Sequence, residues 1–318
     1  MKKNRILIAD ITIDFCSEVE ADLTGISSIY RYHLVDDDGK PAMYRVDFVD
    51  SDERFRIHGD TKVEWEGGAV STITPIKIFN MGADGSKTIL VNDDVLIEHK
   101  PAERYTVCRK YVNRTKKWFG IHKTGIRPKA DDSVLLITQM VLSSFGKYAF
   151  HGCCMAKNGL AYLFLGKSGS GKSTLSTILA ENGYDFMGDD VVYIGKDDNN
   201  QLTAYASLND VKLFNERKTR KNNVDIIEKM HAKYCYKSKI KAISSVIGDF
   251  YCNETHFTKS TSDNLYEMLL RSSNNAIMQY DKSHWLQLCY ELADLPYYVM
   301  LFGNKKFFNP SVMKILDA

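Results

Sequence analysis

The sequence of 318 residues has little proline, little glycine and no surplus of charge of either sign. Six prolines and 20 glycines are too few for a collagen-like chain or for long flexible linkers, and no repeat of fixed period is visible. Lysine and arginine number 42 against 40 aspartates and glutamates, which gives a net charge of +2 with neutral histidines. A broad nucleic-acid surface normally needs a strong basic surplus, so we expect no nucleic-acid partner.

Paired cysteine motifs and long hydrophobic runs are also missing from the sequence. The seven cysteines are an odd number without any Cys-x-x-Cys spacing, which predicts reduced thiols rather than disulfides or a zinc site. The apolar stretch behind the basic N-terminus is interrupted by Asp10 and Asp14, which argues against a signal peptide. No uncharged apolar run approaches the length of a membrane helix. We therefore expect a cytoplasmic protein with no membrane partner.

The length suggests two domains, and the residue pattern divides the chain at about residue 128. Residues 1–128 hold short runs of β-branched and aromatic residues, among them 5–15 and 28–34, separated by turn signals such as Asp38-Gly39. These runs predict a small, mainly-β domain with mostly antiparallel strands. Residues 129–318 alternate between helical and strand patterns and predict an α/β catalytic domain.

The second region begins with an expected helix from Asp131 or Asp132 to Phe145. A tight turn at Asn158-Gly159 is expected to join two strands. A last helix is expected to begin at Pro310, with Asn309 as its cap. The other expected helices are 173–182, 224–236, 264–273 and 281–293, and the expected strands are 148–155, 160–165, 184–194, 241–252 and 297–302.

A complete phosphate-binding loop motif, G-x-x-x-x-G-K-[ST], lies between an expected strand and an expected helix. Its glycines permit positive φ, so that successive amides can turn toward phosphate oxygens, and the helix N-terminus adds partial positive charge. Lys172 is expected to bridge the β- and γ-phosphates, and the Ser173 hydroxyl to ligate Mg²⁺. The motif predicts nucleotide binding by Gly166, Lys167, Ser168, Gly169, Ser170, Gly171, Lys172, Ser173 and Thr174.

Two adjacent carboxylates, Asp189 and Asp190, follow Lys172 by seventeen and eighteen residues. One helix that ends at Gly183 fills this gap, so we expect both at a strand edge next to the strand that feeds the loop. Phosphoryl transfer needs a carboxylate for the metal and a group that accepts the proton of the attacking hydroxyl. The pair can supply both, and the spacing does not decide which residue does which.

The pair His151-Gly152 stands fifteen residues before the loop, at the end of an expected strand. Together with the strand–turn–strand, the loop, the single short helix and Gly188-Asp189-Asp190, it resembles the catalytic domain of HPr kinase/phosphorylase over residues 147 to 194. The Gly-Asp-Asp element is also similar to the metal-binding motif of ATP-dependent phosphoenolpyruvate carboxykinase. The resemblance implies that His151 sits near the transferred phosphate, that Ser173 and Asp189 serve the metal, and that Asp190 is the base.

The fold expected from the resemblance is an α/β P-loop kinase domain of the HPr kinase and phosphoenolpyruvate carboxykinase type, preceded by the mainly-β domain. The expected activity is a kinase that uses ATP and Mg²⁺ and phosphorylates a hydroxyl, preferably serine, of a peptide, a protein or a small molecule. The expected catalytic residues are Lys172, Asp190 and His151. A catalytically silent ATP-binding sensor or scaffold and a gluconate-type metabolite kinase remain alternatives, and a homo-oligomer remains possible. No Leu-Ser-Gly-Gly-Gln signature follows the loop, which argues against an ABC transporter ATPase.

Two weaker features have ordinary explanations. Nine lysines and arginines between Glu216 and Ala242 face three acids and are more typical of a solvated surface than of a partner site. Arg271 follows an apolar helix face. It could reach the transferred phosphate, but an ordinary arginine at a helix end is the favoured explanation.

Overall fold

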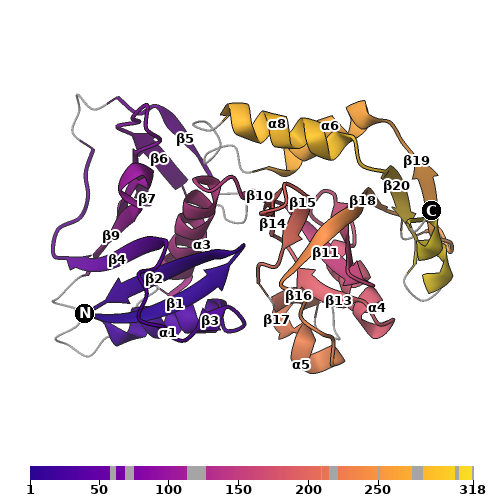
Figure 1. The fold of residues 1–318 in the computed structure, drawn as a ribbon, viewed down its shortest axis with the longest axis horizontal. Coiled ribbons are helices and arrows are strands. Elements are labelled where there is room, and N and C mark those ends of the chain that lie inside the picture. The colour runs from indigo at the N-terminus through magenta and orange to yellow at the C-terminus, as the bar shows by residue number, and fades with distance from the viewer. Residues whose placement is uncertain are drawn as a thin grey trace. The chain divides into compact units, whose positions relative to one another are not determined.

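The computed structural model describes residues 1–57, 62–68, 75–112, 127–208, 210–214, 221–249, 251–273, 282–304 and 308–316. The chain divides into two compact units, the first ending at Phe145 and the second beginning at Gly146 (Figure 1). Each unit has its own large sheet with helices, so the chain is a mixed α/β protein. No helix within the described ranges is both long and apolar enough to span a membrane.

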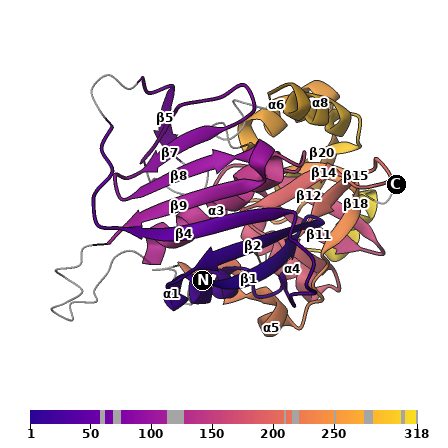
Figure 2. The same ribbon diagram turned by 60° about the vertical axis from the view of Figure 1, so that its left-hand side comes forward.

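The first unit is built on a nine-stranded sheet in the order β3-β1-β2-β4-β9-β8-β7-β6-β5. Figure 2 shows most of these strands following one another in that order. The pairs β2–β4 and β4–β9 are parallel and the other neighbours are antiparallel, as the turn signals led us to expect for most of them. The strands are β1 (Lys2–Ile8), β2 (Ile11–Ser17), β3 (Leu34–Val35), β4 (Tyr44–Ser51), β5 (Trp65–Gly68), β6 (Pro75–Phe79), β7 (Lys87–Val91), β8 (Val95–Lys100) and β9 (Tyr105–Tyr111), with a short 3-10 helix η1 (Pro101–Glu103) before β9.

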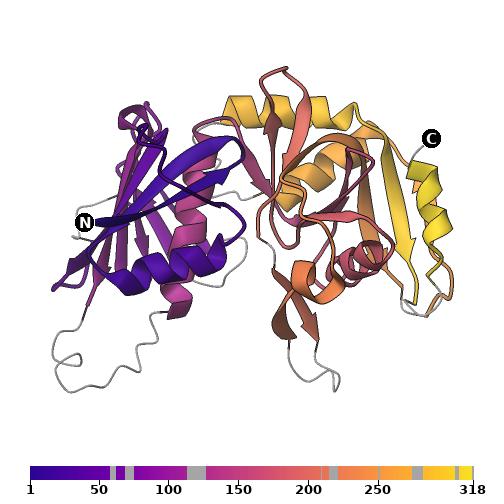
Figure 3. The same cartoon turned by 60° about the horizontal axis from the view of Figure 1, so that its bottom comes forward.

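Helices α1 (Glu20–Ile29) and α3 (Arg127–Ser143) pack on this sheet and on each other (Figure 3). Helix α1 contacts β1 and β2, and α3 contacts β8. Leu23 and Ile26 of α1 are buried three residues apart, which is helical spacing. The strand predicted over 28–34 is therefore wrong, because the β-branched and aromatic residues there belong to the end of a helix and the turn after it.

The boundary between the units differs from the one expected after residue 128. Helix α3 contacts α1 and β8, so it completes the first unit, and the boundary falls after Phe145. The buried side chains of Val134, Ile137 and Val141 repeat at helical spacing, which explains this packing.

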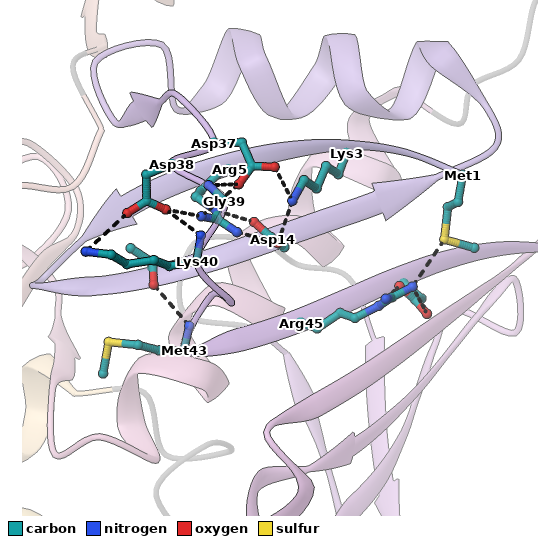
Figure 4. Close-up of polar contacts among 12 residues, drawn as sticks. Met1, Lys3, Arg5, Asp14, Asp37, Asp38, Gly39, Lys40, Met43 and Arg45 are labelled. Carbon is teal, nitrogen blue, oxygen red and sulfur yellow. Dashed lines mark hydrogen bonds and ion pairs between the residues drawn. The ribbon is translucent and has the colours of Figure 1, made fainter.

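Figure 4 shows a network of charged side chains on β1, β2 and the loop after β3. The Arg5 guanidinium donates two hydrogen bonds to the Asp14 carboxylate, at 2.7 and 2.9 Å, and contacts Asp37 and Asp38 at 3.1 and 2.9 Å. Lys3 reaches Asp14 and Asp37 at 3.3 and 2.6 Å. Arg5 is only 6% exposed, so its buried positive charge needs partners of opposite charge, and the three aspartates supply them.

The second unit is built on a sheet in the order β10-β14-β15-β18-β12-β11-β13, extended by β20 on β18 and by β19 on β20. Strands β12 and β20 run parallel to β18, whereas the other pairs are antiparallel. The strands are β10 (Tyr148–Phe150), β11 (Gly152–Lys157), β12 (Leu160–Leu165), β13 (Asp185–Gly188), β14 (Val192–Lys196), β15 (Leu202–Tyr205), β18 (Lys237–Gly248), β19 (His256–Lys259) and β20 (Tyr297–Phe302), and β16 (Asp210–Phe214) pairs with β17 (Lys221–Asp225) in a small separate sheet.

Three helices of this unit, α4, α6 and α8, follow the predicted positions closely. Helix α4 packs on β11 and β13, and α6 packs on α8 and β12. The helix predicted over 224–236 is much shorter, because Asp225 caps it and His231, at φ 51°, ends it. The final segment is a 3-10 helix that Asn309 caps through a 3.0 Å bond from the Ser311 amide. The helices are α4 (Lys172–Glu181), α5 (Ile226–Met230), α6 (Ser262–Ser272), α8 (Lys282–Ala293) and η3 (Pro310–Leu316).

Two predicted strands of the second unit are interrupted at the residues of interest. The run 148–155 breaks at His151 into β10 and β11, and the run 184–194 breaks at Asp189–Val191 into β13 and β14. The Asn158-Gly159 turn between β11 and β12 has φ of 53° and 76°, as a tight hairpin requires. The sheet thus places several polar residues at strand ends.

Candidate functional site

The motif at residues 166–174 connects the end of β12 to the start of α4, which is the strand–loop–helix context that its sequence predicts. Strand β12 is almost wholly buried and leads directly into Gly166. Gly171 stands at the N-cap of α4 with φ 98°, and a Cβ there would lie 2.7 Å from the ring of Phe302. Conformation and close packing both require glycine here. The phenylalanine at the end of β20 therefore backs the loop, a contact that no sequence pattern pointed to.

Lys172 begins α4 and folds back over the loop. Its side chain is buried, and its Nζ donates hydrogen bonds to the carbonyl oxygens of Gly166 at 2.7 Å and Lys167 at 3.1 Å. The Ser170 hydroxyl is buried and has no hydrogen-bond partner among the described residues. The start of α4 thus combines a buried cation, a helix N-terminus and a hydroxyl without a hydrogen-bond partner among the described residues, a combination suited to an anion.

The acidic turn, residues 188–191, joins β13 to β14. Asp189 is 2% exposed, and neither of its carboxylate oxygens has a hydrogen bond within the described part of the chain. Burial raises the pKa of Asp189 to about 6; the neighbouring Ser173 hydroxyl and Lys172 cation lower it, and the Asp190 charge raises it. Asp190 is half-buried and adopts a left-handed φ of 65°, which is unusual for a residue other than glycine.

His151, between β10 and β11, lies against the acidic turn. Its Nδ1 donates a 2.9 Å hydrogen bond to the Asp190 carbonyl oxygen, and its amide donates to the Ser272 carbonyl oxygen at 2.6 Å. When the ring is neutral, a donating Nδ1 leaves Nε2 as an acceptor. The structure therefore brings together His151 and the acidic turn, and places Asp189 within electrostatic reach of Ser173 and Lys172.

The expectation that Asp189 and Asp190 lie next to the strand that feeds the loop is wrong. Strand β13 does not lie next to β12, because β11 runs between them and pairs with both. The Asn158-Gly159 hairpin holds β11 antiparallel to β12, so β13 can only add to the far edge of β11, where Gly188 pairs with Cys154.

The donor set suits a hard cation only in part. Among the described residues, no cluster of three or more His, Cys, Asp or Glu side chains forms a metal site. The Asp189 carboxylate and the Ser173 hydroxyl offer only oxygen atoms, which Mg²⁺ prefers, and Mg²⁺ in nucleotide sites takes its other ligands from phosphates and water. The buried Asp189 carboxylate, which has no hydrogen bond among the described residues, is the feature that fits such an ion.

Of the weaker sequence features, the structure supports the ordinary explanation for Arg271. Arg271 is exposed and pairs with Glu267 one helical turn earlier, which favours the ordinary explanation of its position. In the basic segment between Glu216 and Ala242, residues 216–220 lie outside the described residues.

Comparisons with known proteins give little beyond this geometry. No protein-family model matches the chain, and no curated protein matches it either. Among solved structures, the chain is similar to the HPr(Ser) kinase/phosphatase from Coxiella burnetii, with 12% identity and a TM-score of 0.32 over 53% of this chain and 91% of that chain. A likeness at this level assigns neither fold nor function.

Proposed function

We propose that the protein is an ATP-dependent, Mg²⁺-requiring phosphotransferase that transfers the γ-phosphoryl group to an alcohol, preferably a serine of a peptide or protein, or a hydroxyl of a small molecule. The observation that carries this proposal is the buried carboxylate of Asp189, which makes no well-formed hydrogen bond within the described part of the chain and lies close to Ser173 and Lys172 at the start of α4. A buried polar group without a partner lowers stability. Its position beside Ser173 and Lys172 supports a ligand that supplies the missing partner.

The loop is the proposed nucleotide site. Residues Gly166 to Thr174 would surround the phosphates with backbone amides, and Lys172 would exchange its contacts with the loop carbonyls for β- and γ-phosphate oxygens. Ser173 and Asp189 would hold Mg²⁺, which supplies charge neutralisation on the phosphates when it is bound.

Asp190 is the proposed general base. Its carboxylate would accept the proton of the acceptor hydroxyl while the hydroxyl oxygen bonds to the γ-phosphorus and the bond from that phosphorus to ADP breaks. The products are ADP and a phosphate monoester. His151, which donates Nδ1–H to the Asp190 carbonyl, is assigned a place beside the transferred group through Nε2.

The test is incubation with γ-³²P-labelled ATP, Mg²⁺ and an extract of the source cells, followed by identification of the labelled species. We expect a serine phosphate or a phosphorylated metabolite. Lys172→Ala should abolish ATP binding in calorimetry, whereas Asp190→Asn should retain it and lower transfer about 100-fold or more.

Asp185→Asn is the matched control, since Asp185 is a half-buried carboxylate at the other end of β13 and should leave both measurements unchanged. Tight ATP binding by the wild type with no label in any fraction would instead support the sensor. Unchanged transfer by Asp190→Asn would remove the assigned base.

A further inference from the structure

Ser207 is a buried serine two residues after the end of β15, and it contacts the acidic turn. Its amide donates to the Met187 carbonyl oxygen at 3.0 Å, and its hydroxyl donates to the Val191 carbonyl oxygen. The Tyr234 hydroxyl donates to the Ser207 carbonyl oxygen at 3.1 Å. One residue is therefore bonded to the chain both before and after Asp189 and Asp190.

The serine also packs directly against Gly188. A Cβ on Gly188 would lie 2.5 Å from the Ser207 Oγ and 2.9 Å from the Val191 carbonyl oxygen. Only glycine leaves room for the hydroxyl at this point, so the residue before Asp189 is matched to Ser207.

The conformation of the turn needs such support. Asp190 has a left-handed φ of 65°, and a residue other than glycine keeps this conformation only where its surroundings fix it. His151 bonds to the Asp190 carbonyl oxygen, and the Val191 amide donates to the Asp189 carbonyl oxygen at 2.8 Å. Ser207 closes the same turn at Met187 and Val191.

We infer that Ser207 is a positioning residue that fixes the two carboxylates of the acidic turn through the backbone at Met187, Gly188 and Val191. This assignment rests on the proposed phosphoryl transfer, in which Asp189 and Asp190 must hold fixed places relative to Lys172 and Ser173. In this assignment Ser207 acts only through the backbone of the acidic turn.

The test compares Ser207→Ala with Ser238→Ala. Ser238 is a buried serine of the same sheet whose hydroxyl donates to the Gly159 carbonyl oxygen at 2.6 Å, in the β11–β12 turn. Both variants lose one buried hydroxyl-to-carbonyl bond, but only the first loses it at the acidic turn.

Two readouts are measured, namely hydrogen exchange of the Val191 amide without ligand, and kcat and KM for ATP in the transfer assay. We expect Ser207→Ala to speed the exchange and to lower kcat about tenfold or more with KM for ATP unchanged, because a small misplacement of catalytic groups is costly. Ser238→Ala should change neither.

A Ser207→Ala kcat within twofold of the wild type, or a loss equal to that of Ser238→Ala, would overturn the assignment. If the wild type transfers no phosphoryl group, the proposed function fails, and unchanged exchange of the Val191 amide would then overturn the positioning role separately.

Discussion

The two units treat an aspartate of low exposure in opposite ways. In the first unit the Asp14 carboxylate accepts two hydrogen bonds from Arg5 and lies 3.3 Å from Lys3 (Figure 4). In the second unit Asp189 is more deeply buried, yet neither carboxylate oxygen has a hydrogen bond among the described residues. An aspartate whose charge is paired within the chain stabilises its own unit, whereas a buried aspartate without a hydrogen bond in a turn close to the start of α4 fits a role in binding.

The largest expected effect is a difference in phosphoryl-transfer rate between variants of the two aspartates. Asp189→Asn should lower phosphoryl transfer at least about 100-fold, because Asp189 would hold the metal and the loss of even an outer-shell partner of a metal costs up to about 100-fold. Asp14→Asn should leave the rate within twofold of the wild type, because its partners are Arg5 and Lys3. The labelled-ATP assay measures both. Equal losses in the two variants would contradict the comparison.

The second prediction concerns pH and the stability of the ligand-free protein. The pKa of Asp189 is raised to about 6 from 3.8, so ionisation is less favourable in the folded than in the unfolded chain. The resulting loss of stability is absent below pH 4, grows as pH rises toward 6, and is complete above it. It amounts to about 3 kcal/mol.

Chemical denaturation of the wild type and Asp189→Asn across pH 4 to 8 isolates this contribution, since the other titrating groups cancel in the difference. The free energy of unfolding of Asp189→Asn should increase relative to that of the wild type as pH rises. A difference that does not change with pH would contradict the raised pKa.

Asp14→Asn should lower the free energy of unfolding, whereas Asp189→Asn should raise it. Burial alone would raise the pKa of Asp14, but the hydrogen bonds and charge of Arg5 outweigh burial and lower it. The contribution is present above the unfolded value near pH 4 and is lost as pH falls through the lowered pKa. At pH 7 we expect Asp14→Asn to reduce the free energy of unfolding by about 2 kcal/mol, as measured by urea denaturation. A variant as stable as the wild type would show that the network does not stabilise the unit.

The smallest effect is expected for an exposed pair in the first unit. Lys2 and Glu20 lie 3.0 Å apart, but their side chains are 67% and 78% exposed. Glu20→Gln should change the free energy of unfolding by less than about 0.5 kcal/mol, because solvent screens such pairs. The same denaturation series tests it, and a loss as large as that of Asp14→Asn would mean that burial is not what distinguishes the network.

The sequence allowed prediction of those parts of the site that depend on consecutive residues. The loop from Gly166 to Thr174 lies between a strand and a helix because its glycines, its lysine and the flanking apolar runs are contiguous. Most helices of the second unit were predictable for the same reason, since each carries its own periodicity. Helix α1 was missed because β-branched and aromatic residues around Ser28 resemble a strand locally.

The rest depends on contacts between distant segments. The place of β11 between β12 and β13 follows from strand pairing, which no local pattern encodes. Ser207 and Phe302 were not predictable, because the contacts that matter for the site join each of them to residues far away in the sequence. The apposition of His151 and Asp190, 39 residues apart, was suggested only by the family resemblance.

The most direct test of the central claim is the thermal unfolding of the wild type and Asp189→Asn at pH 7.5, with and without Mg²⁺ and ATP. Without ligand, the asparagine variant should be at least as stable as the wild type, because the unpaired buried charge is removed. With Mg²⁺ and ATP at about 100 times Kd, the wild type should gain about 2.7 kcal/mol, and the variant clearly less. An Asp189→Asn variant that is less stable without ligand and gains as much from Mg²⁺ and ATP would contradict a binding role for the unpaired carboxylate.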